Sequence, residues 1–291
     1  MGSTLRPPII LIGNYRSGTS ITQNLIGLHP DIATWYEPRT LWLSADPSRP
    51  HDEFYRSDAK GKVASYIRKQ FLLYQSRHGG RRVMEKTPSN NLRVPFVDEI
   101  FPDAIYLHIT RNPFSFISSM EYKWQRPKTL KGLRRSLEAT PFTQLPYYAA
   151  QFVRDHFKRR VLRQKYISMY GPRYKGIEDD LKRYSKLRVV AKQWAICNRK
   201  AREDLAKIER SRVFSFLYED LMANPRDLFC EIYNYLKLEY NDGMLEAAQS
   251  MVDPKRQEKW NRLNRQLLRD VLPEIEDEMS HYGYDVPASL H

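Results

Sequence analysis

The chain has 291 residues and a net charge of +14, from 48 Lys or Arg against 34 Asp or Glu. Hydrophobic residues make up 41% of it, enough for a sizeable core, but no apolar run is long enough to predict a membrane-spanning helix. Two cysteines are too few for a disulfide scaffold or a cysteine-rich zinc site. Because the N-terminus lacks the apolar stretch of a secretory signal, we expect a cytoplasmic protein.

Short apolar runs alternate with segments of helical periodicity along the chain. Residues 8–13 form a continuous apolar run that ends in Gly, which is typical of a buried parallel strand. The pattern then predicts a helix at 19–28, a loop at 31–50, strands at 82–85, 104–110 and 213–218, and helices at 59–76 and 186–209. Such alternation predicts an α/β fold, in which helices cover both faces of a mostly parallel sheet and ligands bind at the carboxyl ends of the strands.

Residues 121–190 hold most of the excess charge, with 18 Lys or Arg, 6 Asp or Glu and seven tyrosines. We interpret this stretch as a helical insertion broken by prolines and glycines. A basic region with interleaved aromatic residues can bind nucleic acid, an anionic membrane or an acidic small substrate, whereas the simplest alternative is a solvated insertion with no specific partner. Sequence-specific nucleic-acid binding is the least favoured, since no helix-turn-helix, zinc-finger or RNA-recognition signature is present.

The turn after the first strand carries the most specific local pattern. Residues 13–20 read Gly-Asn-Tyr-Arg-Ser-Gly-Thr-Ser, which matches the phosphate-loop pattern G-x-x-x-x-G-K-[ST] except that Thr19 replaces the Lys. Its glycines let backbone amides face an anion, and the N-terminus of the following helix adds unpaired N–H groups. Arg16 supplies a planar cation suited to a tetrahedral oxyanion. We therefore expect a three-layer, P-loop-like fold that holds a phosphate-like group, but not a magnesium–nucleotide triphosphate.

This loop resembles the 5′-phosphosulfate loop of sulfotransferases that use 3′-phosphoadenosine 5′-phosphosulfate (PAPS), and the resemblance continues along the chain. In that family an Arg after a strand and a later Ser bind the 3′-phosphate, and Arg111 and Ser119 match them. A Tyr-Glu-Asp-Leu phrase whose Tyr lies near the adenine begins here at Tyr218. A Lys-Trp pair that closes over the cofactor is matched by Lys259 and Trp260. The motif pattern is closest to tyrosylprotein sulfotransferases and their bacterial relatives.

The resemblance implies PAPS as the cofactor and 3′-phosphoadenosine 5′-phosphate (PAP) as its product. The residues implied to bind it are Arg16, Ser17, Gly18, Thr19, Ser20, Arg111, Ser119, Tyr218, Lys259 and Trp260. A sulfuryl group carries less charge than a γ-phosphoryl group, so we expect cations of the protein, and no metal, to stabilise the bridging oxygen. Arg16 and Lys86 are the candidates, because Lys86 stands in a Glu-Lys-Thr phrase that recurs in the related enzymes, where the Lys stabilises the leaving oxygen. The alternative for Lys86 is a surface lysine paired with Glu85.

We predict that Glu37 is the base that takes the proton of the acceptor hydroxyl. The related enzymes have a His-Pro-Asp stretch, a catalytic Glu in this register and a comparable Arg; here residues 29–31 precede Glu37, and Arg39 follows it. Pro38 departs from the family pattern. Aromatic neighbours are expected to desolvate the carboxylate and raise its pKa toward a useful range. His108 is the second candidate, although a buried histidine is expected inside its strand.

The sequence thus predicts one domain over 1–291 that moves a sulfuryl group in line from PAPS to a hydroxyl, with an amine as the less favoured acceptor. Residues 121–190 have the position and size of an acceptor-side lid, and their composition suits a saccharide, a lipid or steroid, or a phenolic alcohol. One alternative is a P-loop kinase or NTPase acting on ATP, which the missing loop Lys and the neutral strand end at Thr110 disfavour. Another is a basic protein that binds nucleic acid or a membrane surface, with an affinity that falls steeply with salt.

Overall fold

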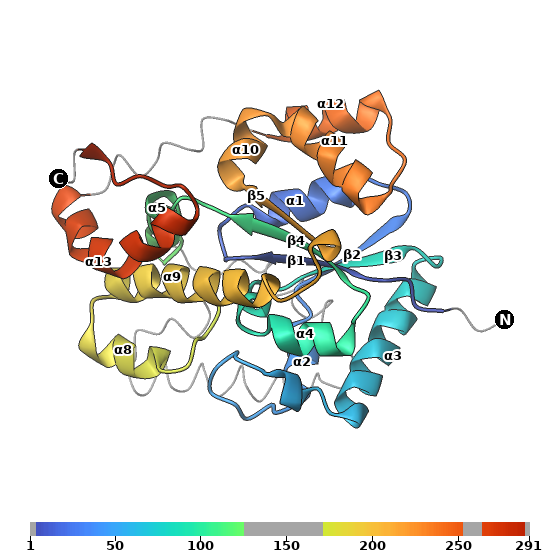
Figure 1. Cartoon of the computed structure of the whole chain (residues 1–291), viewed down its shortest axis with the longest axis horizontal. Coiled ribbons are helices and arrows are strands. Elements are labelled where there is room, and N and C mark those ends of the chain that lie inside the picture. The colour runs from blue at the N-terminus through green and yellow to red at the C-terminus, as the bar shows by residue number, and fades with distance from the viewer. Residues whose placement is uncertain (1–3, 125–170, 253–263, 289–291) are drawn as a thin grey trace.

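A five-stranded, all-parallel sheet of order β2-β3-β1-β4-β5 forms the centre of the computed structural model, which describes residues 4–124, 171–252 and 264–288. Its strands are β1 (Ile9–Gly13), β2 (Ile32–Tyr36), β3 (Arg82–Lys86), β4 (Ile105–Thr110) and β5 (Val213–Leu217). Helices lie on both faces (Figure 1). The expected three-layer α/β fold is confirmed.

The strand β2 corrects the sequence analysis, which placed a loop over residues 31–50. The segment Ile32–Tyr36 instead pairs with β3 along its whole length, with Tyr36 opposite Lys86. It is rich in the β-branched and aromatic residues that favour strands, but its shortness and the prolines on either side hide the pattern. The pairing places Glu37 at the carboxyl end of a strand rather than within a long loop.

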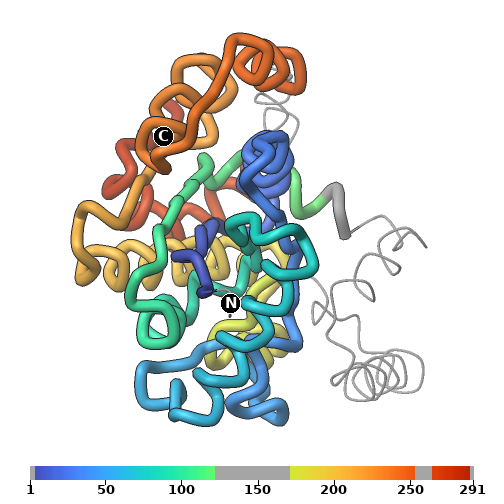
Figure 2. The backbone as a smooth tube through the Cα atoms, turned by 90° about the vertical axis from the view of Figure 1, so that its right-hand side faces the viewer, coloured from blue at the N-terminus to red at the C-terminus, as the bar shows by residue number. Residues whose placement is uncertain are grey.

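The helices form two layers around the sheet. One layer holds α1 (Thr19–Ile26), α10 (Tyr218–Ala223), α11 (Pro225–Leu236) and α12 (Asp242–Met251). The other holds α2 (Arg39–Trp42), α3 (Gly61–Arg77), α4 (Val94–Ile100) and α9 (Lys186–Leu205), with α5 (Pro113–Trp124), α8 (Ile177–Arg183) and α13 (Arg265–His281) near α9. Figure 2 shows the orange α11 and α12 at the top and the blue-to-cyan stretch with α2 and α3 at the bottom.

The core divides at the sheet, because successive side chains of a strand point to opposite faces. On β1, Ile9 and Leu11 belong to the apolar cluster with α1, α11 and α12, whereas Ile10 and Ile12 belong to the cluster with α3 and α4. All four side chains are fully buried, as a strand covered on both faces requires. In the part of the chain that the structure describes, no helix is both long and apolar enough to cross a bilayer.

The other expected elements are present with shifted ends. The helix predicted at 59–76 is α3, and the helix predicted at 186–209 is α9, which ends at Leu205. Of the basic insertion predicted at 121–190, residues 125–170 lie outside the described residues. Its last part forms α8 and the start of α9, after a non-helical stretch at 171–176.

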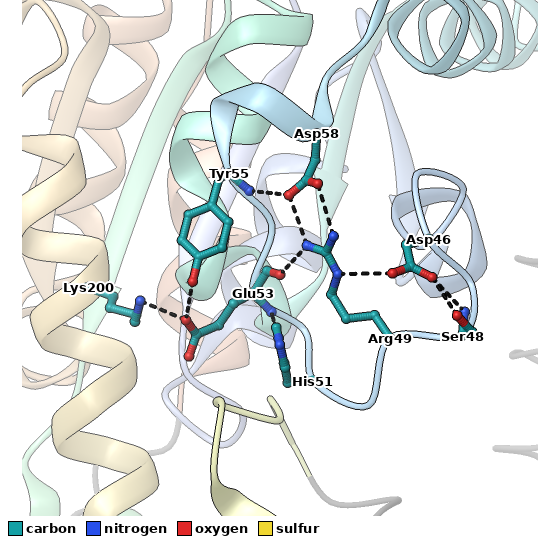
Figure 3. A network of polar contacts seen from close by, with 8 residues as sticks. All are labelled: Asp46, Ser48, Arg49, His51, Glu53, Tyr55, Asp58 and Lys200. Carbon is teal, nitrogen blue, oxygen red and sulfur yellow. Dashed lines mark hydrogen bonds and ion pairs between the residues drawn. The ribbon is translucent and has the colours of Figure 1, made fainter.

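The long connection between α2 and α3 is fixed by a network of charges (Figure 3). The guanidinium of Arg49 donates to both carboxylate oxygens of Asp58, at 2.8 and 2.9 Å, and to the carbonyl of Glu53 at 3.0 Å. The carboxylate of Glu53 pairs with Lys200 of α9 at 2.9 Å and accepts from the Tyr55 hydroxyl. The connection is therefore attached to the helical layer beneath the sheet.

The same connection also holds the chain that leads into α8. Asp52 accepts from the backbone N–H of Arg173 at 2.8 Å and from its guanidinium at 2.9 Å, and Ser89 donates to the same carboxylate at 2.8 Å. Glu53 accepts from the N–H of Lys175 at 2.8 Å. Neighbouring acids thus join three segments that are far apart in the sequence.

Candidate active site

The loop between β1 and α1 turns at two residues with left-handed backbone. Arg16 has a φ of 71°, and Gly18, the N-cap of α1, has a φ of 90°. Between them, the Ser17 N–H donates to the Asn14 carbonyl at 3.1 Å, while the buried Ser17 hydroxyl has no hydrogen-bond partner among the described residues. No side chain of the described part caps the N-terminus of α1. A buried free hydroxyl and an uncapped helix start give this loop the donors that an anion requires.

Both glycines of the loop are required by close packing. A Cβ at Gly13 would lie 2.6 Å from a methyl group of Ile109 on β4. A Cβ at Gly18 would collide with the ring of Tyr218, at the start of α10. The loop backbone therefore lies directly against the two neighbouring strand ends, where the family motifs also fall.

A buried amide, to which the sequence analysis gave no role, fastens the loop from below. Asn14 donates to the carbonyl of Trp194 on α9 and accepts from Asn91 in the 3₁₀ turn Pro88–Leu92, each at 3.3 Å. Asn14 stands inside the phosphate-loop pattern, but at a position where the pattern allows any residue, so the sequence carried no specific signal for it. Asn14 is fully buried, and its two hydrogen bonds connect the loop to α9 and to the 3₁₀ turn.

Four of the residues expected to hold the cofactor come together at the ends of β1, β4 and β5. The Arg16 Nε donates to the Ser119 hydroxyl of α5 at 3.0 Å. Arg111 donates to the Arg16 carbonyl at 2.9 Å, and its guanidinium lies 4.2 Å from the centre of the Tyr218 ring. Burial lowers the pKa of Arg111, but a guanidinium remains protonated at any physiological pH. The cluster therefore brings two cations, a hydroxyl and an aromatic ring from four segments to one point.

Lys86 ends β3 on the other side of the loop. Its ammonium donates to Glu37 Oε1 at 2.8 Å and to the Ser20 hydroxyl at 3.2 Å, and it lies 4.2 Å from the centre of the Tyr36 ring. The side chain is 1% exposed, so the surface lysine considered as an alternative is wrong. Its partner is Glu37 rather than Glu85.

The pKa of Glu37 is lowered, opposite to the expectation. Burial by itself would raise the pKa, but the charges of Arg39 and Lys86 outweigh burial and lower it to about 2. Arg39 donates to Oε2 from two nitrogens, at 3.1 and 2.8 Å, while Lys86 holds Oε1. The expectation failed because it considered the aromatic neighbours in sequence and not the two cations, of which Lys86 arrives from a different strand.

Trp42, one of the aromatic residues that were expected to surround Glu37, donates to Glu85 instead. Glu85 is fully buried and accepts from the Trp42 indole at 3.1 Å, from Asn90 at 2.8 Å and from the Thr87 hydroxyl. Burial raises its pKa to about 7 despite these hydrogen bonds. Alternation along β3 therefore separates a desolvated acid on one face from the lysine on the other.

The backbone at Glu37 is also unusual. Its φ is 47°, and with Arg16 and Lys237 it is one of three non-glycine residues with positive φ in the described segments. Lys237 ends α11, where left-handed residues are common. The other two are the residues predicted to act as base and cation. Such conformations cost about 1–3 kcal/mol each and concentrate at functional sites.

The remaining candidates differ in where the structure places them. His108 is buried within β4, 3.4 Å from the hydroxyls of Thr110 and Ser215, and burial lowers its pKa to about 4. Lys259 and Trp260 lie outside the described residues. Thr19, the third hydroxyl residue of the loop, is buried in the first turn of α1.

Fold and site together define an α/β protein whose loop after β1 has free donors suited to an anion, with a carboxylate and a lysine paired beside this loop. A family model described as the sulfotransferase family matches residues 7–170. Over 135 residues the chain is 24% identical to nodulation protein NoeE of Sinorhizobium fredii, and this match spans 40% of the chain and 32% of NoeE. The family match covers more than half of the chain, and the protein therefore belongs to the sulfotransferase family.

Solved structures agree on the fold. The sulfotransferase domain from the curacin biosynthetic pathway is similar with a TM-score of 0.60 at 14% identity, over 98% of this chain and all of that domain. A sulfotransferase from Alicyclobacillus acidocaldarius is similar with a TM-score of 0.52 at 17% identity, over 99% of this chain and 100% of the other. At these identities the likeness establishes the arrangement of the sheet and helices.

Proposed function

We propose that the protein transfers a sulfuryl group from PAPS to the hydroxyl group of an acceptor, with Glu37 as the base. The observation that carries the proposal is the hydrogen bond between Lys86 and Glu37 at 2.8 Å, beside Ser20 of the loop. One group can hold a proton and the other can stabilise negative charge, and both face the expected site of the sulfuryl group.

The described residues fit the donor. Ser17 offers an unpaired hydroxyl, and the uncapped start of α1 offers backbone N–H groups for the 5′-phosphosulfate. Arg111 and Ser119 are the proposed ligands of the 3′-phosphate, and the Tyr218 ring, which packs on Gly18, is proposed to lie near the adenine. PAPS would supply a sulfuryl group on an activated bridge to phosphate, and this group passes to the acceptor oxygen.

Lys86 and Arg16 are the proposed catalytic cations. Both lie beside hydroxyls of the cofactor region, Lys86 at Ser20 and Arg16 at Ser119. A fixed ammonium in a water-poor site stabilises charge that grows on a bridging oxygen more strongly than water does. These cations are the reason that we expect the reaction to proceed without a metal.

The low pKa of Glu37 is compatible with its proposed role because Lys86 can interact either with Glu37 or with the leaving oxygen. While Lys86 donates to Glu37, the carboxylate is a weak base. When the ammonium turns toward the leaving oxygen, Glu37 retains only Arg39 as a cationic partner, and its pKa rises toward the range useful for catalysis. The base would then accept the acceptor's proton on Oε1.

The acceptor class is proposed more broadly: a hydroxyl of a saccharide, a lipid or steroid, or a phenol. The assignment of 121–190 as an acceptor-side lid within one domain stays a prediction, since residues 125–170 lie outside the described part. A screen of hydroxyl compounds with isotope-labelled PAPS, followed by mass spectrometry, should find a product heavier by one SO₃ group.

The screen includes EDTA in one arm and ATP with Mg²⁺ in another. Transfer that persists in EDTA supports the proposal. Magnesium-dependent turnover of ATP without sulfuryl transfer would contradict it and favour a P-loop kinase or NTPase. Binding of polyanions that vanishes with salt, and that does not depend on Glu37, would favour the basic binding protein.

A further inference from the structure

Glu219, the residue after Tyr218, joins three parts of the chain by hydrogen bonds. Its Oε1 accepts from the backbone N–H of Asn112 at 3.2 Å, in the turn that follows β4. Its Oε2 accepts from the hydroxyl of Tyr284 at 2.8 Å, in the chain after α13. One carboxylate at the start of α10 therefore holds both the turn beside Arg111 and the C-terminal segment.

The turn that Glu219 holds contains Arg111 and leads into α5, which carries Ser119; these are the two residues proposed to bind the 3′-phosphate. The carbonyl of Arg111 accepts from the Trp194 indole at 2.9 Å, so the backbone is fixed on either side of the Arg111–Asn112 peptide bond. The Asn112 side chain accepts from the N–H groups of Phe114 and Ser115, at 3.0 and 3.2 Å, and so caps the start of α5. The orientation of α5 in turn places Ser119 against Arg16.

The charges near Arg111 also support a role for Glu219 in holding it. Arg111 is 8% exposed, and the negative charge of Glu219 opposes the effect of burial on its pKa. Burial and the neighbouring Glu219 raise the pKa of Tyr284, so its hydroxyl stays protonated and remains a donor. Glu219 is therefore an acceptor for Tyr284 and Asn112 and also a fixed counter-charge close to Arg111.

We propose that Glu219 and Tyr284 are positioning residues that set Arg111 and Ser119 for the 3′-phosphate of the donor. The C-terminal segment after α13 thereby becomes part of the support of the cofactor site, although it is remote from it in sequence. This inference rests on the proposed function, because the 3′-phosphate assignment does. The sequence contained a signal for Glu219, which is the acid of the Tyr-Glu-Asp-Leu phrase, but none for Tyr284.

The test compares binding of PAP with binding of adenosine 5′-phosphate, which lacks the 3′-phosphate, by calorimetry. Tyr284→Phe should weaken PAP binding by about 5- to 30-fold, the effect of one lost hydrogen bond, and leave adenosine 5′-phosphate binding unchanged. Glu219→Ala should weaken PAP binding more than Tyr284→Phe. Glu219→Gln should recover part of the loss, because its amide oxygen can still accept from Asn112.

Tyr235→Phe is the matched control, since it removes the same hydroxyl from α11, where it donates to the Ser211 carbonyl at 2.8 Å, beyond the amino end of β5 and away from Arg111. It should leave the ratio of the two affinities unchanged. Equal losses for both nucleotides in Tyr284→Phe, or no loss, would overturn the inference. If Glu219→Ala does not fold, Tyr284→Phe and Glu219→Gln decide the matter. A wild-type protein that does not bind PAP would refute the proposed function itself.

Discussion

The connection between α2 and α3 and the strand-end site are both built from charged side chains, but they use them differently. In the connection, Asp52 and Glu53 each bind a backbone N–H and a cationic side chain of another segment. At the site, Arg16, Arg39, Lys86 and Arg111 gather around few acids, and Lys86 is shared between Glu37 and Ser20. Paired charges with fixed backbone partners join segments, whereas an excess of shared cations leaves capacity for an anionic ligand.

The largest expected effect is on turnover. Glu37→Ala and Lys86→Ala should each lower the rate of sulfuryl transfer by about 10²- to 10⁴-fold, because they remove the base and the charge on the leaving oxygen. Calorimetry should find PAP binding largely retained. Lys207→Ala, which removes an exposed lysine paired with Asp204, is the control and should leave the rate unchanged. Near-normal turnover in Glu37→Ala would refute Glu37 as the base.

The next effect is on stability and separates the two regions. Asp52→Ala should lower the free energy of unfolding by about 3–5 kcal/mol, because it leaves the buried Arg93 and the partly buried Arg173 without the Asp52 carboxylate. Urea unfolding measures this, with Asp46→Ala as the control at the exposed end of the same connection, where less than about 1 kcal/mol is expected. A loss as small as that of the control would show that the connection is not held by its charges.

A smaller effect is expected on nucleotide affinity. Arg111→Ala should weaken PAP binding by about 10- to 100-fold, as the loss of a charged hydrogen-bond donor implies. Affinity for adenosine 5′-phosphate, measured alongside, shows whether the lost binding energy comes from contacts with the 3′-phosphate. Unchanged affinity for PAP would refute the assignment of Arg111.

The smallest effect is a change in how stability depends on pH. Since burial raises the pKa of Glu85 to about 7 from its ordinary 4.5, the folded chain holds this proton more tightly, and stability falls as the pH rises from 4.5 to 7. The pKa of Glu37 is lowered to about 2, so its contribution is present above pH 4.5 and is lost as the pH falls toward 2. Glu85→Gln should remove the fall in stability between pH 4.5 and 7. Glu37→Gln should remove part of the loss of stability below pH 4.5. Urea unfolding across pH decides this, and unaltered slopes would contradict it.

Much of the fold could be predicted from sequence because the buried strands β1 and β4 are continuous apolar runs next to a glycine turn or a proline. The meeting of Arg16, Arg111 and Tyr218 followed from the rule that parallel strands end at one edge. β2 was missed because a five-residue strand between prolines has too few residues to show a period. The pKa of Glu37 was predicted in the wrong direction, since it depends on the charge of Arg39, two residues further on, and on Lys86, which only the pairing of β2 with β3 brings near.

The left-handed backbone at Arg16 and Glu37 has a consequence for directed evolution. Glycine or asparagine would relax these two turns, but neither supplies a guanidinium or a carboxylate. A library selected for heat resistance alone should therefore enrich replacements at both positions and yield robust but inert variants. Enrichment at such sites, mapped by deep sequencing, would trace the outline of the reaction centre without any substrate in hand.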